Sequence, residues 1–275
     1  MIAVPRDFVL VEKGPLALVM RAGMSGQLVG CGLADPERLC SSPQAVSAHA
    51  GRGSMPAVEL DPGAHERVLV RKYRRGGLLR LFLPDVFFSS RRSFDELAVT
   101  LAAAQAGIPV AEVVAAARLR TAGILWRHYL VTRELPECCD LPAWFQSGAA
   151  DEDAASLARP LADLVRRMHD SGLYHADLNL KNILVSRDDA RRLFIIDWDK
   201  STHARGLLGH EARQRNVLRL CRSAAKLRLR GIPVPARFAD TFLEQYWQNP
   251  EDADACRRAL RRVLKGRKFF WRFIG

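Results

Sequence analysis

The stretch HADLNLKNILVSRDDARRLFIIDWD, residues 175–199, decides the fold of this chain. Its two apolar runs, ILV and LFII, predict two short strands, and the charged segment between them predicts their turn. Asn182 immediately precedes the first strand, and Asp197 immediately follows the second. The predicted hairpin therefore brings these two side chains together, with Asp177 in the loop just before them.

These residue types suit phosphate chemistry. An aspartate at the start of a loop can take a proton from a hydroxyl, and an amide oxygen can bind Mg²⁺ beside a carboxylate without adding charge repulsion. The pattern HxDxxxxN, strand, turn, strand, D thus predicts Asp177 as catalytic base and Asn182 and Asp197 as magnesium ligands. HxD alone, or DxD alone, more often marks a polar loop or a surface turn, but the joint pattern favours phosphotransfer. We expect His175 to be a structural hydrogen-bonding group under the loop.

Composition narrows the class of protein. The chain has 275 residues, 48% of them hydrophobic, and a net charge of +12, so it can bury a full core and favours an anionic partner: a phosphorylated ligand, an anionic membrane surface or a nucleic acid. No apolar run reaches the roughly 20 residues of a membrane-spanning helix, and no signal peptide is evident. Neither the cysteines nor the histidines have zinc-ligand spacing. These features predict a cytoplasmic protein.

The glycine-rich segment Gly51-Arg52-Gly53-Ser54 stands upstream of the predicted strand VLVR. A glycine-rich turn lets backbone N–H groups approach a phosphate, so Gly51, Gly53 and Ser54 are candidate nucleotide-binding residues; a plain hairpin turn is the alternative. Arg71 ends the strand, and alternation points its neighbour Lys72 to the other face. A solvated basic strand end is the competing interpretation of Arg71.

The segment SFDELAVTLAAAQA, residues 93–106, has the spacing of a helix that begins with Ser93 as N-cap. Glu96 is then either the ion-pair partner of Arg71 or a capping carboxylate, and we favour the ion pair. Further along, two strands around the turn 121–123 lead into Arg133-Glu134-Leu135-Pro136, a hinge whose backbone, Glu134 included, would receive an adenine ring. An apolar helical face, residues 157–168, ends near Gly172, which suits a left-handed C-terminal position.

The C-terminal end is basic and then aromatic. A helix follows Asp199 quickly, at residues 215–226. There is no APE element and little room for a long peptide-docking segment, so a small-molecule or lipid-linked acceptor is expected. Basic residues followed by aromatics suit an anionic membrane surface; docking of the tail on its own core is the alternative. Nucleic acid is unlikely, because no RRM, KH or zinc-finger signature is present. The basic residues of the tail are Arg257, Arg258, Arg261, Arg262, Lys265, Arg267 and Lys268, before Phe269-Phe270-Trp271-Arg272-Phe273.

The chain resembles the bacterial lipopolysaccharide kinases, and within that family the members that act on 3-deoxy-D-manno-octulosonic acid (Kdo). The resemblance covers about residues 51–226. YRRGG and RLCRS separate this family from protein kinases in general, whereas HxDxxxxN is widely shared. The resemblance to the family rests on GRGS (51–54), VLVRKYRRGGL (68–78), FDEL with AGIPV (94–110), YHADLNLKNIL (174–184), IIDWDKS (195–201) and RNVLRLCRSAAK (215–226).

The resemblance implies a kinase that uses ATP and Mg²⁺ and phosphorylates the 4-hydroxyl of Kdo on a lipid A precursor, an anionic glycolipid, at the cytoplasmic face of the inner membrane. The resemblance also implies that Arg71, paired with Glu96, positions the phosphates of ATP. Asn179 stands where many protein kinases carry a lysine, so Arg75 or Lys181 would have to supply that charge. A core heptose kinase, another small-molecule kinase of this fold, and a non-catalytic pseudokinase scaffold are the alternatives.

The fold class implied is α+β: a protein-kinase-like, two-lobed fold with a small, mostly β N-lobe that carries one helix and a larger, mostly helical C-lobe. We expect residues 1–45 to form an irregular N-terminal extension with room for one hairpin. Residues 46–134 would form the N-lobe, and residues 135–275 the C-lobe with its basic and aromatic tail.

Overall fold

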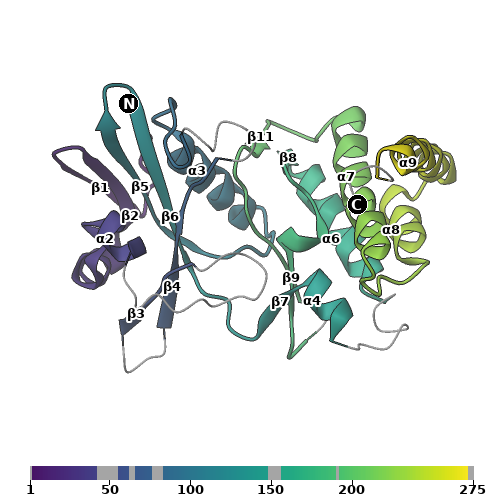
Figure 1. The fold of residues 1–275 in the computed structure, drawn as a ribbon, viewed down its shortest axis with the longest axis horizontal. Helices are drawn as coiled ribbons and strands as arrows, with labels where there is room; N and C mark the ends of the chain where they lie inside the picture. Colours follow the sequence, from purple (N-terminus) through teal and green to yellow (C-terminus); the bar gives the residue numbers. More distant parts are fainter. Residues whose placement is uncertain are drawn as a thin grey trace. The chain divides into compact units, whose positions relative to one another are not determined.

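The structure, a computed structural model, describes residues 2–41, 55–61, 66–75, 83–147, 156–189 and 192–271. The chain divides into two compact units (Figure 1). The first unit comprises Met1–Ala102 and Ala111–Pro136, and the second comprises Ala103–Val110 and Glu137–Gly275. The change at Pro136 lies near the lobe boundary expected at residues 134 and 135, whereas the transfer of residues 103–110 to the second unit was not expected.

Among the described residues of the first unit, six strands form one antiparallel sheet in the order β1-β2-β5-β6-β4-β3. The predicted strands at VLVR and on either side of the turn 121–123 are present, and β5 and β6 extend to the turn itself. The bounds are β1 (Phe8–Lys13), β2 (Leu16–Arg21), β3 (Ala57–Asp61), β4 (Glu66–Lys72), β5 (Val113–Ala122) and β6 (Leu125–Arg133).

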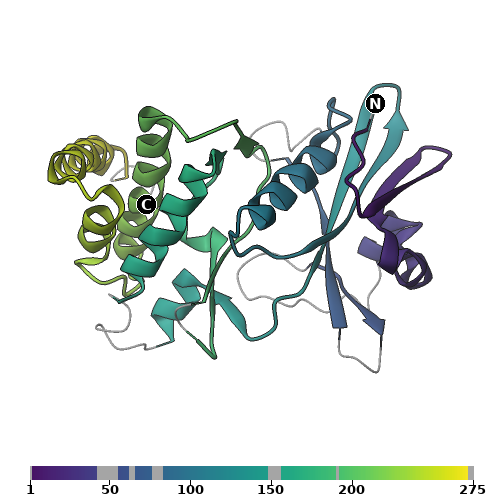
Figure 2. The ribbon, with the colours of Figure 1, turned by 180° about the vertical axis from the view of Figure 1, so that it is seen from behind.

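One face of this sheet carries α3 (Arg92–Gln105), which Figure 2 shows lying along the strands. Phe94 and Leu97 of α3 pack against apolar side chains of β5 and β6. Tyr73, which follows β4 directly, is in the same cluster. Because side chains alternate along a strand, Arg71 shares this face with Tyr73.

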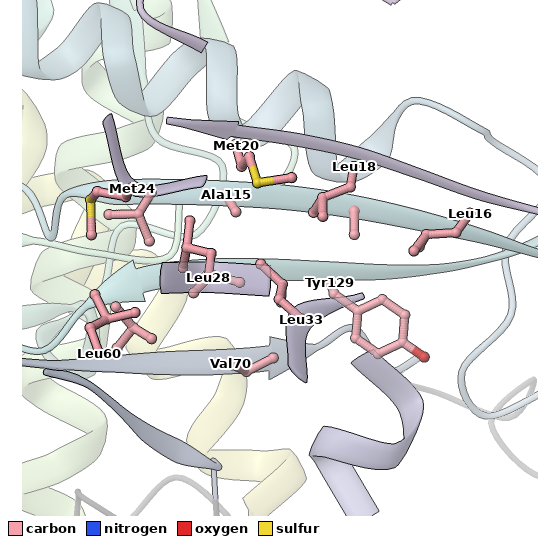
Figure 3. Packing of buried hydrophobic residues seen from close by; sticks show 14 residues of the cluster. Leu16, Leu18, Met20, Met24, Leu28, Leu33, Leu60, Val70, Ala115 and Tyr129 are labelled. Atoms are coloured by element: carbon pink, nitrogen blue, oxygen red, sulfur yellow. The ribbon is translucent and has the colours of Figure 1, made fainter. Parts of the chain in front are cut away.

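The other face of the sheet is covered by the segment that follows β2 (Figure 3). Met24, Leu28 and Leu33 of this segment pack against strand residues such as Val70 and Tyr129. Lys72 lies on this second face, as the alternation predicted, and its ammonium group pairs with Asp85 at 2.6 Å. The segment comprises η1 (Ala22–Met24), α1 (Ser25–Leu28), η2 (Val29–Leu33) and α2 (Pro36–Ser41).

The expectation of an irregular N-terminal extension is wrong for the described residues 2–41. β1 and β2 form a hairpin, and β2 pairs with β5 from Leu16↔Leu119 to Met20↔Ala115. Residues 16–20 are buried because β2 lies inside the sheet, between β1 and β5. These residues are therefore an integral part of the first unit, and one hairpin is present as the sequence allowed.

The second unit is mostly helical, with short strands at residues 138–140 and between residues 173 and 203. The predicted apolar face of α6 is buried, and Gly172 after it has a φ of +75°, the left-handed conformation expected there. The described elements of the second unit are β7 (Cys138–Asp140), α4 (Leu141–Gln146), α6 (Ala158–Asp170), β8 (Leu173–Tyr174), η4 (Leu180–Asn182), β9 (Ile183–Ser186), β10 (Leu193–Ile195), β11 (Thr202–His203), α7 (His210–Leu229), α8 (Phe238–Trp247) and α9 (Pro250–Trp271).

Candidate active site

The loop between β8 and β9 holds Asp177 and Asn182. Asn182 is buried, and its Nδ2 donates to the Asp177 carbonyl oxygen at 2.9 Å, which closes the loop on itself. Asn179 supports the same turn, since its Nδ2 also donates to that carbonyl and its Oδ1 accepts from the Lys181 N–H. The Asp177 carboxylate remains 59% exposed. The loop thus presents a carboxylate to solvent from a fixed backbone.

The predicted β9-β10 hairpin is present and brings Asp197 to this loop. Its register pairs Ile183 with Ile195, and the Ile196 N–H donates to the Asn182 carbonyl at 3.0 Å. Asp197 follows directly, with a φ of +65°. A non-glycine residue in this region costs of order 1–3 kcal/mol and recurs at functional sites. Asn182 and Asp197 therefore stand at neighbouring strand ends.

His175 lies under the loop, fully buried, with its ring edge against Trp198. Its Nε2 donates to the Ile196 carbonyl at 3.1 Å, and its Nδ1 accepts the Asp177 N–H at 3.2 Å. A ring that donates at one nitrogen and accepts at the other is neutral, and burial lowers the pKa of this imidazole. His175 has the structural hydrogen-bonding position that the sequence predicted.

Helix α7 contributes three polar side chains that the sequence interpretation missed. Asn216 is buried; its Nδ2 donates to the His175 carbonyl at 2.7 Å, and its Oδ1 accepts the His175 N–H. Arg219 donates to Asp177 Oδ1 at 3.3 Å, and the Ser223 hydroxyl accepts the Leu180 N–H at 3.1 Å. The signal was their spacing of three and four residues, which places them on one helix face.

In the first unit, Arg71 of β4 and Glu96 of α3 form the expected ion pair. Arg71 Nη2 contacts both Glu96 carboxylate oxygens, at 2.6 and 2.5 Å, and the Glu96 side chain is 2% exposed. The Tyr73 hydroxyl donates to the same carboxylate. The capping alternative is wrong, because α3 begins at Arg92 and the Ser93 hydroxyl donates to the Ala117 carbonyl.

The remaining candidates are the nucleotide-binding residues and the cations proposed to replace the missing lysine. Gly51, Gly53 and Ser54 lie outside the described residues. The Glu134 N–H donates to the Arg67 carbonyl, and its carboxylate pairs with Arg67 at 3.3 Å. Arg75, one candidate for the missing positive charge, donates to the Val86 carbonyl and lies over the Phe87 ring. The structure places a different cation, Arg219, beside the Asp177 carboxylate.

The described residues also bear on metal binding and on membrane crossing. No group of three or more His, Cys, Asp or Glu side chains there has the arrangement of a metal site; the Asn182 and Asp197 pair contains fewer such side chains than that. Within the same residues, every helix is too short or too polar to cross a membrane.

A mostly β unit in which an Arg–Glu pair joins a strand to one helix, and a mostly helical unit with an HxDxxxxN loop and a hairpin ending in aspartate, define a protein-kinase-like fold. Of solved structures, that of WaaP in complex with acyl carrier protein matches with a TM-score of 0.60 and 19% identity, over 94% of this chain and 98% of that one.

The family follows from sequence comparison. The profile of the lipopolysaccharide kinase (Kdo/WaaP) family matches residues 50–248. The 3-deoxy-D-manno-octulosonic acid kinase of Vibrio cholerae is 30% identical over 202 residues, which cover 70% of this chain and 81% of that protein. The enzyme of the same name from Pasteurella multocida is 31% identical, over 65% of this chain and 71% of that one. This chain belongs to the lipopolysaccharide kinase (Kdo/WaaP) family.

Proposed function

We propose that this chain is an ATP-dependent kinase that phosphorylates the 4-hydroxyl of Kdo on a lipid A precursor. The observation that carries the proposal is the hydrogen-bonded loop of Asp177 and Asn182 joined to Asp197 through Ile196. The name that several relatives share supports Kdo as the acceptor. A pseudokinase scaffold would have no need of all three polar side chains.

Asp177 is the proposed catalytic base. Its carboxylate is exposed to an incoming acceptor, while its backbone N–H and carbonyl are held by His175, Asn179 and Asn182. A base that orients and deprotonates a hydroxyl must be fixed within hydrogen-bond reach of it. The backbone bonds supply that fixation, so the acceptor meets a carboxylate that needs little reorganisation.

Asn182 and Asp197 fit the requirements of a bound Mg²⁺. Magnesium prefers hard oxygen ligands and is usually held by one or two carboxylates together with substrate phosphates. The Asn182 amide nitrogen faces the Asp177 carbonyl, so its oxygen faces away from that group. When bound, the ion would neutralise charge on the phosphates of ATP. The backbone bonds of the loop and of the β9-β10 hairpin position Asn182 and Asp197 for the ion and hold Asp177 beside them.

Arg71 is proposed to position the ATP phosphates, in place of the usual lysine. Its guanidinium is planar and offers several donors in a fork, so it can hold Glu96 and a phosphate oxygen at once. Glu96 and the Tyr73 ring fix its position. Gly51, Gly53, Ser54 and the backbone carbonyl of Glu134, whose N–H already donates to the Arg67 carbonyl, complete the proposed nucleotide site.

The test is transfer of labelled phosphate from ATP to a Kdo-bearing lipid A precursor, with a heptose-bearing core oligosaccharide as the competing acceptor. We expect label on the Kdo acceptor, abolished in Asp177→Asn and in Asp197→Ala and dependent on Mg²⁺. Label only on the heptose acceptor would move the assignment to a core heptose kinase. ATP turnover unchanged in both variants would contradict the catalytic assignment.

We further propose that the chain binds peripherally to the cytoplasmic face of the inner membrane, because its acceptor is a lipid and the C-terminal end of α9 is basic and then aromatic. Arg257 is not part of this surface: it pairs with Asp240, Glu244 and Asp254. Sedimentation with vesicles containing anionic lipid should retain the full chain and release a chain ending at Lys265. Equal binding of both chains would remove the tail from this proposal.

A further inference from the structure

One polar face of helix α7 contacts the catalytic loop. Asn216, Arg219 and Ser223 contact, in turn, the backbone of His175, the carboxylate of Asp177 and the backbone of Leu180. Two of these three side chains hold backbone groups and so have a purely structural task. Arg219 is different, because it contacts the side chain that the proposed mechanism uses.

The Arg219 side chain is partly free to serve a ligand. It is 46% exposed, and its bond to Asp177 runs from one nitrogen to one oxygen at 3.3 Å, at the long end for a charge-assisted pair. A guanidinium has five N–H donors in a fixed fork that matches a carboxylate. It can therefore contact Asp177 and accept a second anion beside it.

Arg219 also belongs to a basic stripe. Arg215, Arg222 and Lys226 recur with it at intervals of four, three and four residues, which places all four on one side of α7. Arg215 and Lys226 are exposed, and Arg222 is partly exposed. The stripe runs along the helix beside the residues that contact the catalytic loop, so an anionic molecule seated at Asp177 meets positive charge there.

We propose that Arg219 binds the carboxylate of the sugar-acid acceptor and thereby orients its ring for transfer at Asp177. This inference rests on the proposed function. Asp177 must contact the accepting hydroxyl of Kdo, and the carboxylate of that sugar is bonded to C2, two ring atoms from the C4 hydroxyl. The cation that already touches the base is therefore in place to receive the acid group of the same ring.

The experiment combines two enzymes with two acceptors: wild type and Arg219→Gln, each with the natural acceptor and with one whose Kdo carboxylate has been converted to the primary amide. The lipid phosphates are unchanged in the amide, so it separates the sugar carboxylate from phosphate as the bound anion. A bidentate charged pair changes affinity by about 10- to 100-fold. We expect Arg219→Gln to raise the acceptor KM by about that factor and to leave the ATP KM unchanged.

The wild type should lose a similar factor on the amide, and Arg219→Gln should no longer distinguish the two acceptors. Arg219→Lys should recover part of the loss, because it keeps the charge without the fork. Arg228→Gln is the matched control: it removes the same charge from an exposed position on another side of α7, and we expect the wild-type acceptor KM.

Independent, multiplying losses from the variant and from the amide would overturn the proposal, since the two groups would then act separately. So would a fall in kcat and in acceptor-independent ATP hydrolysis at an unchanged acceptor KM, which would assign Arg219 to the transferred phosphate. If the wild type transferred no phosphate to Kdo while it still hydrolysed ATP, the proposed acceptor itself would be wrong, and this inference with it.

Discussion

Tyr73 donates its hydroxyl hydrogen bond to Glu96, the carboxylate that also holds Arg71. The ring centroid of the same tyrosine lies 4.7 Å from the Arg71 guanidinium carbon. Tyr73 thus contacts both members of the ion pair, one through its hydroxyl and the other through its face. Because the hydroxyl holds the carboxylate and the ring holds the cation, a substitution can remove one interaction and keep the other.

Tyr73→Phe removes only the hydroxyl. A hydrogen bond to a charged group contributes about 1.5–3 kcal/mol, so we expect kcat/KM for ATP to fall about tenfold or more and the acceptor KM to stay unchanged. Steady-state kinetics with each substrate varied would measure this. Tyr129→Phe is the control, because its hydroxyl contacts Glu37 on the opposite face of the sheet. Equal losses in both variants would assign the effect to general destabilisation.

Arg71→Lys tests whether charge alone suffices on β4. Lysine keeps the charge, but it loses the planar contact with the Tyr73 ring and the further N–H donors that could hold a phosphate oxygen while Nη2 holds Glu96. We expect the dissociation constant for ATP to rise about tenfold in Arg71→Lys, since one charge-assisted contact is lost, and to rise further in Arg71→Met. The measurement is nucleotide binding by calorimetry. Wild-type affinity in Arg71→Lys would show that the guanidinium geometry contributes nothing.

Asn216→Ala removes the side chain that satisfies three buried groups: the His175 N–H, the His175 carbonyl and His169 Nε2. Leaving a buried polar group unpaired costs about 1–3 kcal/mol, so we expect a loss of at least about 3 kcal/mol in unfolding free energy and a lower kcat. Urea denaturation measures the first. Ser223→Ala, which removes one bond to the loop, should lose far less, and equal losses would contradict this account.

The parts predicted from sequence are those fixed by near neighbours in the chain. Asn182 and Asp197 stand at neighbouring strand ends because a short turn joins two apolar runs, and the Arg71–Glu96 pair follows from one strand and the next helix. The parts that were missed depend on distant contacts. β2 pairs with β5, about 100 residues later in the chain, and Arg219 reaches Asp177 across 42 residues. Local periodicity carries no information about either.

The buried histidine His169 predicts a dependence of stability on pH. Its Nε2 donates to Asn216 Oδ1, its Nδ1 accepts from the Tyr246 hydroxyl, and burial lowers its pKa from 6.5 to about 4. Between these values the unfolded chain binds a proton that the folded chain does not. The stability contribution of the neutral ring is therefore full above pH 6.5 and is lost as pH falls towards 4, at about 1.4 kcal/mol per pH unit.

His169→Gln should consequently flatten the fall in unfolding free energy between pH 6.5 and 4, although it lowers stability at pH 7.5. Urea denaturation at intervals of half a pH unit would measure the slope. His203→Gln is the control at an exposed position and should keep the wild-type slope. A slope unchanged in His169→Gln would show that other groups cause the acid sensitivity.

Gly172 and Gly206 separate two reasons why a position requires glycine, a left-handed φ and a close approach of other backbone atoms. Its φ is +75°, and a Cβ atom added there would overlap the carbonyl oxygens of Gly206 and Ala204. Gly206 has a φ of +80° with open space around the same atom. A left-handed alanine costs about 1–2 kcal/mol, so Gly206→Ala should lose that amount. Gly172→Ala should lose several kcal/mol more, because backbone must move.

The backbone that an alanine at position 172 would displace is connected to the loop of Asp177. β11, just before Ala204, pairs with β8, and β8 runs into His175. We therefore expect Gly172→Ala to lower kcat as well as the unfolding free energy, while Gly206→Ala keeps its activity at a temperature where both variants are folded. Losses of equal size in the two variants, measured by urea denaturation, would show that the close approach has no energetic weight and that φ alone decides.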